Sequence, residues 1–297
     1  MILSYHPCFV GDKNRLCAGR EPDDSDQTAI RAAAAVILPQ GCSRSLWEMA
    51  RDGCPNVFPN FDCRFAYSGK TGQARLFRET GIPHPATTVV TRLAATDGGL
   101  PIPPLPADFP LVLKYDWGGE GESVFLVPSE ADLRPMLETA RRAEGRGRRG
   151  IVLQQFIPHD RSLRVTVVGN RSIAYWRVNP TTDNFQANLA AGGRIDRRWR
   201  PDLMQTATTS VARWCRRLKI DLAGFDILFD LRRPDPLPLF LEINYFFGRR
   251  GLGGSEAFYR LLVDEIGRWL KARGLTPPAV SQTDGDEQWA EKDRDPS

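Results

Sequence analysis

Apolar and polar positions alternate most clearly over Leu222–Phe247, where two runs rich in β-forming residues flank the proline-rich segment Arg232–Pro238. This pattern predicts a hairpin of two antiparallel strands. With the turn centred in the proline-rich segment, the register places Asp226 opposite Asn244, and Glu242 lies one pair closer to the turn. Because side chains alternate between the faces of a strand, we expect these three oxygen-bearing side chains to lie together.

Two carboxylates on one face of a strand pair repel each other unless a cation holds them. Hard oxygen ligands in this arrangement are typical of a magnesium ion that bridges to phosphates. A solvated outer face of the hairpin explains the same spacing. The spacing alone therefore leaves a metal site and a solvent-facing surface both open.

A second hairpin is predicted over Leu163–Val178, with its turn at a Gly-Asn dipeptide. Its register pairs Ser162 with Arg177 and Arg164 with Tyr175, so the two arginines share one face. Inward-facing arginines suit a triphosphate or a carboxylate. Exposed arginines on an edge strand are the alternative interpretation.

A strand over Leu111–Lys114 leads into a glycine-rich loop, and a further strand is expected over Ser123–Val127. The loop carries three glycines, Gly118, Gly119 and Gly121. Glycines let backbone amides approach an anion closely, and Lys114 adds a compact positive charge. The pattern indicates a phosphate-binding loop, although an ordinary flexible hairpin loop gives the same sequence.

The other periodic stretches predict a mixed α+β fold. The expected helices are Ser45–Arg51, Thr71–Thr80 ended by Gly81, Ser129–Ala143 with Ser129 as N-cap, one from about Asp202 to Lys219, and Ser255–Arg273. The expected strands are Met1–Tyr5, Asn56–Pro59, Thr87–Thr91 and Ile151–Ile157. We expect the polar segment Gly11–Gln27 to be a loop, whereas Ala32–Leu38 fits either a helix end or a buried strand.

These elements suggest a short α/β domain over residues 1–69 and a larger domain over residues 70–275. Leu93–Pro110 is rich in proline and glycine and is typical of a linker, so the boundary is expected within it or just before Lys70. The polar segment 276–297 is expected to be disordered.

The composition, 41% apolar and 26% charged, is that of a globular protein. The net charge of +4 suits a nucleotide as well as a nucleic acid. Tryptophan and phenylalanine fall mostly in apolar strands and helices rather than among arginines, which argues against a nucleic-acid-binding module.

The 6 cysteines form no C-x-x-C pair and match no zinc template. The chain shows no signal-peptide pattern, and its longest apolar run, Ala32–Pro39, is too short to cross a bilayer. We therefore expect a cytoplasmic protein with reduced thiols and no membrane partner.

The order of these motifs resembles the ATP-grasp superfamily, most of all its RimK-like branch of ribosomal-protein glutamate ligases and glutathione synthetases. The matching features are the Lys114 strand with its glycine-rich loop, Q-Q-F-I, the arginine hairpin, N-F-Q-A-N-L-A-A-G-G, and finally G-F-D-I with L-E-I-N. The resemblance covers roughly Lys70 to Lys271. It implies two α+β lobes that grip ATP, preceded here by a short α/β N-terminal domain.

The resemblance also implies a role for each matching residue. Asp226, Glu242 and Asn244 would hold magnesium, or manganese in its place. Nucleotide contacts would come from Lys70, Lys114, Gly118, Gly119, Gly121, Ser123, Gln154, Gln155, Phe156 and Ile157. Arg177 and Asn188 would face the γ-phosphate and the acyl substrate, and Arg164 would line the acceptor side.

Some positions depart from the family pattern, and most lie near the expected substrate. Gln155 stands where the family usually has Glu, Ser162 replaces an acid before Arg164, and Gln186 replaces an arginine. Gly248–Gly251 replaces the usual Ser-Pro-Gly. These differences weaken any transfer of substrate identity from the family.

The activity implied is that of an ATP-dependent carboxylate–amine ligase, which forms a peptide bond through an acyl phosphate and yields ADP and phosphate. The arginines suggest a small anionic carboxylate substrate, and an amino acid, a peptide or a protein tail would serve as amine acceptor. The alternative is an ATP-binding protein of the same fold without ligase activity. The sequence leaves the oligomeric state open, a homo-oligomer included.

Overall fold

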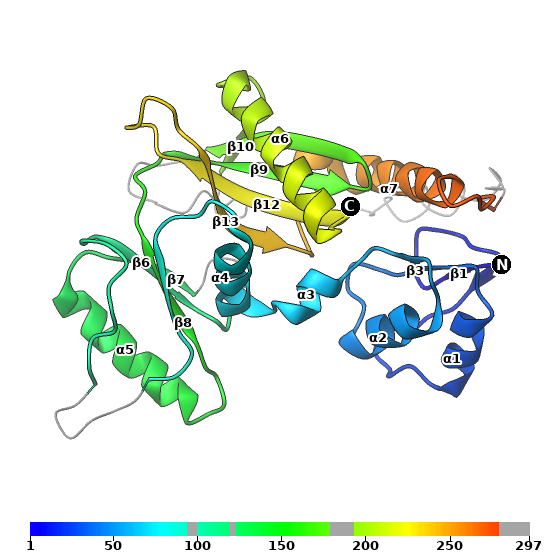
Figure 1. Cartoon of the computed structure of the whole chain (residues 1–297), viewed down its shortest axis with the longest axis horizontal. Helices are drawn as coiled ribbons and strands as arrows, with labels where there is room; N and C mark the ends of the chain where they lie inside the picture. The colour runs from blue at the N-terminus through cyan, green and yellow to red at the C-terminus, as the bar shows by residue number, and fades with distance from the viewer. Residues whose placement is uncertain (94–99, 119–122, 179–192, 279–297) are drawn as a thin grey trace, which may run out of the picture. The chain divides into compact units, whose positions relative to one another are not determined.

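The computed structural model describes residues 1–93, 100–118, 123–178 and 193–278. The chain divides into two compact units (Figure 1). The first consists of Met1–Pro59 together with the chain from Tyr259 onward, and the second is Asn60–Phe258. The predicted tail lies largely outside the described residues. No helix in the described part of the chain combines the length and the apolar character that a membrane span needs.

The first unit is built on a parallel sheet in the order β2-β1-β3-β4. Its strands are β1 (Ile2–Ser4), β2 (Lys13–Asn14), β3 (Ala35–Ile37) and β4 (Val57–Phe58), and its helices are α1 (Asp24–Arg31) and α2 (Arg44–Gly53), with the later part of α7 (Gly254–Lys271). The strands predicted over Met1–Tyr5 and Asn56–Pro59 are confirmed as β1 and β4. Ala32–Leu38 contains a buried strand, β3.

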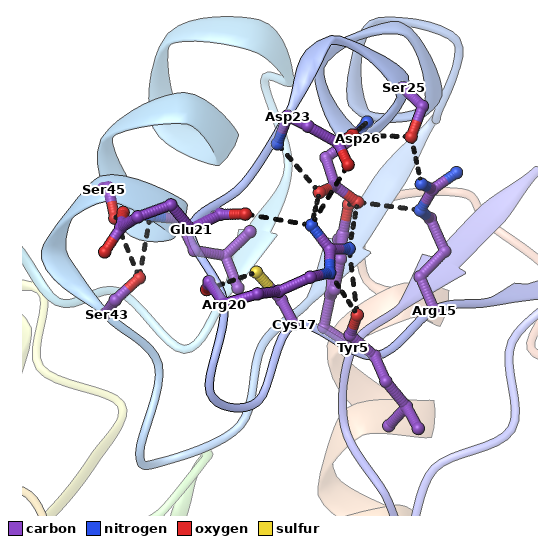
Figure 2. Close-up of polar contacts among 12 residues, drawn as sticks. Tyr5, Arg15, Cys17, Arg20, Glu21, Asp23, Ser25, Asp26, Ser43 and Ser45 are labelled. Carbon is purple, nitrogen blue, oxygen red and sulfur yellow. Dashed lines mark hydrogen bonds and ion pairs between the residues drawn. The ribbon is translucent and has the colours of Figure 1, made fainter.

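The expectation that Gly11–Gln27 is a loop is wrong in part, because this segment contains β2 and the start of α1. Hydrogen bonds and ion pairs with the Asp26 side chain hold this segment in place. Asp26 of α1 is fully buried and accepts hydrogen bonds from Tyr5 Oη (2.8 Å), Arg15 Nε (2.8 Å) and Arg20 Nη1 (2.6 Å) (Figure 2). Asp23 and Asp26 also complete a capping box at the start of α1. Four parts of the unit therefore converge on one carboxylate.

The second unit contains a five-stranded antiparallel sheet in the order β11-β10-β9-β12-β13 among its described residues. The strands are β9 (Arg161–Val168), β10 (Arg171–Val178), β11 (Arg194–Asp196), β12 (Leu222–Phe229) and β13 (Pro238–Asn244). Helix α6 (Pro201–Leu218) packs on β9, β10 and β13. Both predicted hairpins are confirmed, and the arginine hairpin has the predicted register, with Ser162 opposite Arg177 and Arg164 opposite Tyr175.

The register predicted for the other hairpin is wrong. Asp226 pairs with Glu242, and Asn244 lies opposite Gly224. The cause is the position of the turn: Phe229 pairs with Pro238, which centres the turn between Arg233 and Pro234 rather than in the middle of Arg232–Pro238. An irregularity between Asp226 and Ile227, where β13 carries one extra residue, Leu241, shifts the pairing by one residue and brings Glu242 opposite Asp226. Because Asp226, Glu242 and Asn244 lie on the same side of the bulge, they still share one face of the sheet.

The same unit contains a four-stranded sheet in the order β5-β8-β6-β7 among its described residues. Its strands are β5 (Thr87–Val90), β6 (Leu111–Tyr115), β7 (Val124–Val127) and β8 (Ile151–Gln155). Helix α5 (Glu130–Glu144) covers one face through Leu133, Leu137 and Ala140, which are buried with Leu111 and Leu153 in one apolar cluster. Ser129 caps α5 as predicted, because its hydroxyl accepts the N–H of Asp132.

Short helices complete this unit: α3 (Asp62–Ala66), α4 (Gly69–Thr80) and the 3-10 turn η1 (Arg250–Leu252). The predicted end of α4 is confirmed, since Gly81 adopts a left-handed conformation with φ of 78°. The predicted N-cap of the last helix differs from the structure, because α7 begins at Gly254 and already includes Ser255.

Candidate functional site

A cavity of about 810 Å³ in the second unit is lined by both sheets and by α4. The predicted residues that line it are Lys70, Lys114, Gly118, Gln154, Gln155, Phe156, Ile157, Arg164, Arg177, Asp226, Glu242 and Asn244. Residues as far apart in the sequence as Lys70 and Asn244 thus line one space. Its size suits a small organic ligand such as a nucleotide.

Asp226 carries the most heavily bonded carboxylate of the cavity. Arg164 binds it through two nitrogens, with Nε at 2.6 Å from Oδ1 and Nη2 at 3.2 Å from Oδ2. Arg177 Nη2 lies 2.8 Å from Oδ1, and Asn244 Nδ2 donates to Oδ2 at 3.2 Å. Burial alone would raise the pKa of Asp226, but the two arginines outweigh it and hold the pKa below its usual value. The cavity therefore contains a carboxylate whose ionised form is stabilised by two cations.

Gly224 makes room for this arrangement. It lies on β12 next to the arginine hairpin, and a Cβ at this position would lie 2.7 Å from Arg164 Nη1. A side chain there would push the Arg164 guanidinium away from Asp226. The glycine in G-F-D-I is thus explained by close approach of a side chain rather than by a turn.

Glu242 and Lys114 form the second charged centre. Burial is the main cause of the raised pKa of Glu242, and the nearby Asp226 carboxylate adds to it, while Lys114 and Lys70 oppose it. Burial lowers the pKa of Lys114 to about 8, against the opposing effect of Glu242. Among the described residues, no side chain or backbone group makes a hydrogen bond or ion pair with the Glu242 carboxylate. A bound cation would therefore not have to displace an existing partner.

Helix α4 supplies a further cation of the cavity, Lys70. Lys70 Nζ donates to the Gly118 carbonyl (3.3 Å) and to Ser123 Oγ (3.1 Å). One turn further on, the Gln73 amide is bonded to both backbone groups of Ile243, donating to its carbonyl and accepting its N–H at 2.8 Å each. Gln73 therefore fixes α4 to the strand that carries Glu242 and Asn244.

Three predicted residues, Gly119, Gly121 and Asn188, lie outside the described residues. Ser123 does not line the cavity but bonds Lys70, which does. At the expected adenine end, the Gln155 N–H donates to Ala86 O at 2.8 Å, so this donor is already used inside the protein. Gln154 is buried and donates to Thr87 Oγ1 at 3.0 Å.

Some residues of the cavity were not predicted from the sequence as site residues. Gln73 has a sequence signal, because it lies three residues after Lys70 and so on the same helix face. Tyr175 also has a sequence signal, because the predicted register placed it opposite Arg164. Phe246, His84 and Leu241 also line the cavity, and Leu241 owes its place to the bulge, which leaves no mark in the alternation.

Comparison with known families now decides what kind of domain this is. Residues 68–255 match the family of the RimK-like ATP-grasp domain, which covers more than half of the chain. The chain belongs to the RimK-like ATP-grasp family. The resemblance that the order of motifs indicated is thereby confirmed at the level of the family.

Curated relatives of this RimK-like protein are similar over part of its length. It is 28% identical over 176 residues to a probable alpha-L-glutamate ligase of Picosynechococcus, a match that covers 58% of this chain and 51% of the relative. A probable alpha-L-glutamate ligase of Enterobacter is 26% identical over 213 residues, which is 69% of this chain and 61% of the relative. The chain thus spans about half the length of the first of these relatives, 51%.

Solved structures with the same fold support the ATP-grasp assignment. A D-alanine–D-alanine ligase from Bacillus anthracis complexed with ATP matches with a TM-score of 0.58 and 16% identity, over 90% of this chain and 89% of that one. A RimK domain ATP-grasp protein from Sphaerobacter thermophilus matches with a TM-score of 0.51 and 17% identity, over 78% and 81%. The predicted fold class, ATP-grasp with mixed α and β elements, is confirmed.

Proposed function

We propose that this RimK-like ATP-grasp protein is an ATP-dependent carboxylate–amine ligase that yields ADP and phosphate. The observation that carries the proposal is the composition of the cavity. Two lysines and two arginines surround a pair of carboxylates, Asp226 and Glu242, within one space. A polyphosphate with its counter-cation requires both signs of charge in this proximity.

In this proposal the nucleotide lies along the cavity between the two sheets. Its phosphates lie at Lys70 and Lys114, where the strand end and Gly118 provide backbone groups and positive charge. The base lies towards the segment from Gln155 to Ile157, which lines the same cavity. The aromatic ring of Phe156 offers an apolar surface there.

The residues present suit a divalent cation. Asp226, Glu242 and Asn244 present carboxylate and amide oxygens, which are the ligands magnesium prefers, and manganese accepts the same set. Glu242 supports this assignment most, since it is a half-buried carboxylate paired across the strands with a second carboxylate. When bound, the ion would neutralise charge that develops on the transferred phosphoryl group.

The reaction we propose is carboxylate activation. A carboxylate oxygen of the substrate attacks the γ-phosphorus of ATP, and the bond to the bridging oxygen of ADP breaks. An amine nitrogen then attacks the acyl carbon, phosphate leaves, and the nitrogen loses a proton to solvent. Arg177 and Lys114 stabilise the negative charge on the transferred group, and Arg164 holds Asp226 and lines the acceptor side. No protein nucleophile is required.

The substrates we propose are a small anionic carboxylate and an amine, carried by an amino acid, a peptide or a protein tail. Arg249 and Arg250 line the cavity just beyond the metal-ligand strand, which adds positive charge to the two arginines of β9 and β10. The relatives named as probable alpha-L-glutamate ligases make glutamate the first carboxylic amino acid to offer.

The test is magnesium-dependent release of ADP from ATP, with pools of carboxylic acids and amines offered in turn. We expect ADP rather than AMP, and a rate that requires both a carboxylate and an amine. Glu242→Gln removes the charge that suits the cation, and turnover should fall roughly 100-fold. Glu130→Gln on the exposed surface of α5 is the matched control and should leave turnover unchanged.

Two outcomes would contradict the proposal. Near-wild-type turnover of Glu242→Gln would remove the metal assignment. Binding of ATP without ADP from any pool would support an ATP-binding protein of the same fold without ligase activity.

A further inference from the structure

Asp116 makes an unusual contact with the start of helix α4. It lies just after β6, in the turn that leads to Gly118, and its carboxylate accepts two hydrogen bonds from one residue of α4. The Thr71 N–H donates to Oδ1 at 2.9 Å, and the Thr71 hydroxyl donates to Oδ2 at 2.8 Å. Both carboxylate oxygens are therefore used at the N-terminus of this helix.

Asp116 takes the role of a helix cap from a distant part of the chain. Ser68 stands at the N-cap position with an extended backbone, but its side chain caps nothing. Because the first N–H groups of a helix have no partner within it, an acceptor must come from elsewhere. A carboxylate is the preferred acceptor here, since its charge also complements the helix dipole.

Two glycines make this approach possible. Gly69 has φ of +74°, and a Cβ there would lie 2.5 Å from Asp116 Oδ1. Gly150 has φ of +93°, its carbonyl accepts the Asp116 N–H at 3.1 Å, and a Cβ there would lie 3.3 Å from Asp116 Cβ. The carboxylate thus lies between two segments that carry no side chains at the point of contact.

Lys70 lies between Gly69 and Thr71, the two residues against which Asp116 packs. Its amine lines the cavity and bonds Gly118 and Ser123, whereas Asp116 itself does not line the cavity. Asp116 therefore acts on a ligand of the cavity only indirectly, through the first turn of α4 that it holds or through its own turn, which leads to Gly118.

We propose that Asp116 is a positioning residue, which fixes the first turn of α4 and thereby holds the Lys70 amine at the phosphate end of the cavity. The inference rests on the proposed function, because it assumes that phosphates of ATP bind at Lys70. It assigns the two residues Asp116 and Thr71 to the nucleotide site without contact between either residue and the nucleotide.

The test measures binding of ATP with magnesium to the full chain by calorimetry, without turnover. Asp116→Ala removes both acceptors, and we expect the affinity for ATP to fall roughly fivefold to tenfold. This fold-change corresponds to the free energy that loss of a helix N-cap costs, if all of it is lost from the binding of ATP at Lys70. Asp116→Asn keeps one acceptor for the Thr71 N–H and should recover most of the affinity. Asp132→Ala, which removes a carboxylate at the start of α5, is the matched control and should bind ATP as the wild type does.

A double-mutant cycle separates positioning from general stability. If Asp116 acts through Lys70, Asp116→Ala should cause no further loss of affinity in a Lys70→Met background. The same loss in both backgrounds would contradict the proposal. Should Asp116→Ala fail to fold, Thr71→Val takes its place in the cycle, because it removes only the hydroxyl bond and keeps the backbone one.

The two proposals fail in different ways. If the wild type binds ATP and Asp116→Ala binds it equally well, the positioning role is wrong and the proposed function stands. If the wild type binds no ATP with magnesium, the proposed function is wrong, and the positioning role is wrong with it.

Discussion

At the scale of single residues, the site depends on how Asp226 is held. The alternation of the strands placed Arg164 and Arg177 on one face and left open whether that face and the face of Asp226 point inward, and the structure joins the three residues in one ion cluster. The sequence could not show which carboxylate each arginine binds, because side-chain pairing across strands depends on the register. The register of the Leu222–Phe247 hairpin was missed because its turn is centred between Arg233 and Pro234, and a proline-rich segment does not fix the centre of its turn.

Gly224→Ala tests this cluster without removing any charge. Its Cβ would lie 2.7 Å from Arg164 Nη1, so the guanidinium must shift from its position on Asp226. We expect kcat/KM for ATP turnover to fall roughly tenfold and stability to fall by about 1–3 kcal/mol. Gly41→Ala is the matched control, because its Cβ would meet no atom within 4 Å. Wild-type turnover in Gly224→Ala would show that Arg164 need not contact Asp226.

At the scale of elements, local patterns predicted most helices and strands, but they failed for Gly11–Gln27. This segment is mostly polar, and its order comes from the contacts of Arg15 and Arg20 with Asp26, a residue of α1. Pairings between residues that are distant in sequence leave no periodic signal. The N-terminus of α4 is a similar case, since its cap, Asp116, lies 45 residues further along the chain.

The Asp26 cluster predicts how the stability of the first unit depends on pH. Burial would raise the pKa of Asp26, but hydrogen bonds from Arg20, the Asp23 backbone and Tyr5 outweigh it and lower the pKa. A lowered pKa in the folded state contributes stability above the unfolded value of about 3.9, and this stability is lost as the pH falls below that value.

Asp26→Asn should therefore lower the melting temperature at pH 7, where breaking a buried ion pair costs on the order of 3 kcal/mol. The difference in melting temperature between Asp26→Asn and the wild type should become smaller between pH 5 and pH 3. Asp52→Asn, on an exposed carboxylate of α2, is the control. If the difference in melting temperature stays constant from pH 7 to pH 3, protonation of Asp26 does not control the stability of the folded state in this range.

At the scale of the whole molecule, the order of motifs predicted the family, and residues 68–255 confirm it. The N-terminal 65 residues carry none of these motifs and could be matched to the family by position alone. The domain boundaries stay predictions. Substrate identity could not be predicted either, because the residues that depart from the family pattern are those expected near the substrate, and Gln186 lies outside the described residues.

Ligand binding gives a prediction at this scale. A ligand that binds only the folded protein stabilises it in proportion to the logarithm of its concentration. ATP with magnesium at about 100 times its dissociation constant should stabilise the protein by about 2.7 kcal/mol and raise the melting temperature. Lys114→Met should reduce this shift, because it removes a half-buried cation of the phosphate end. An equal shift in Lys114→Met would place the phosphates elsewhere.

The most direct test of acyl-phosphate chemistry is trapping with hydroxylamine. The protein is incubated with ATP, magnesium and a pool of carboxylic acids, and hydroxylamine replaces the amine. We predict equal amounts of ADP and a hydroxamate, because hydroxylamine attacks the activated acyl carbon, and the hydroxamate identifies the carboxylate substrate. ADP without hydroxamate from any acid, or AMP in place of ADP, would contradict the central claim that this protein activates a carboxylate by phosphorylation.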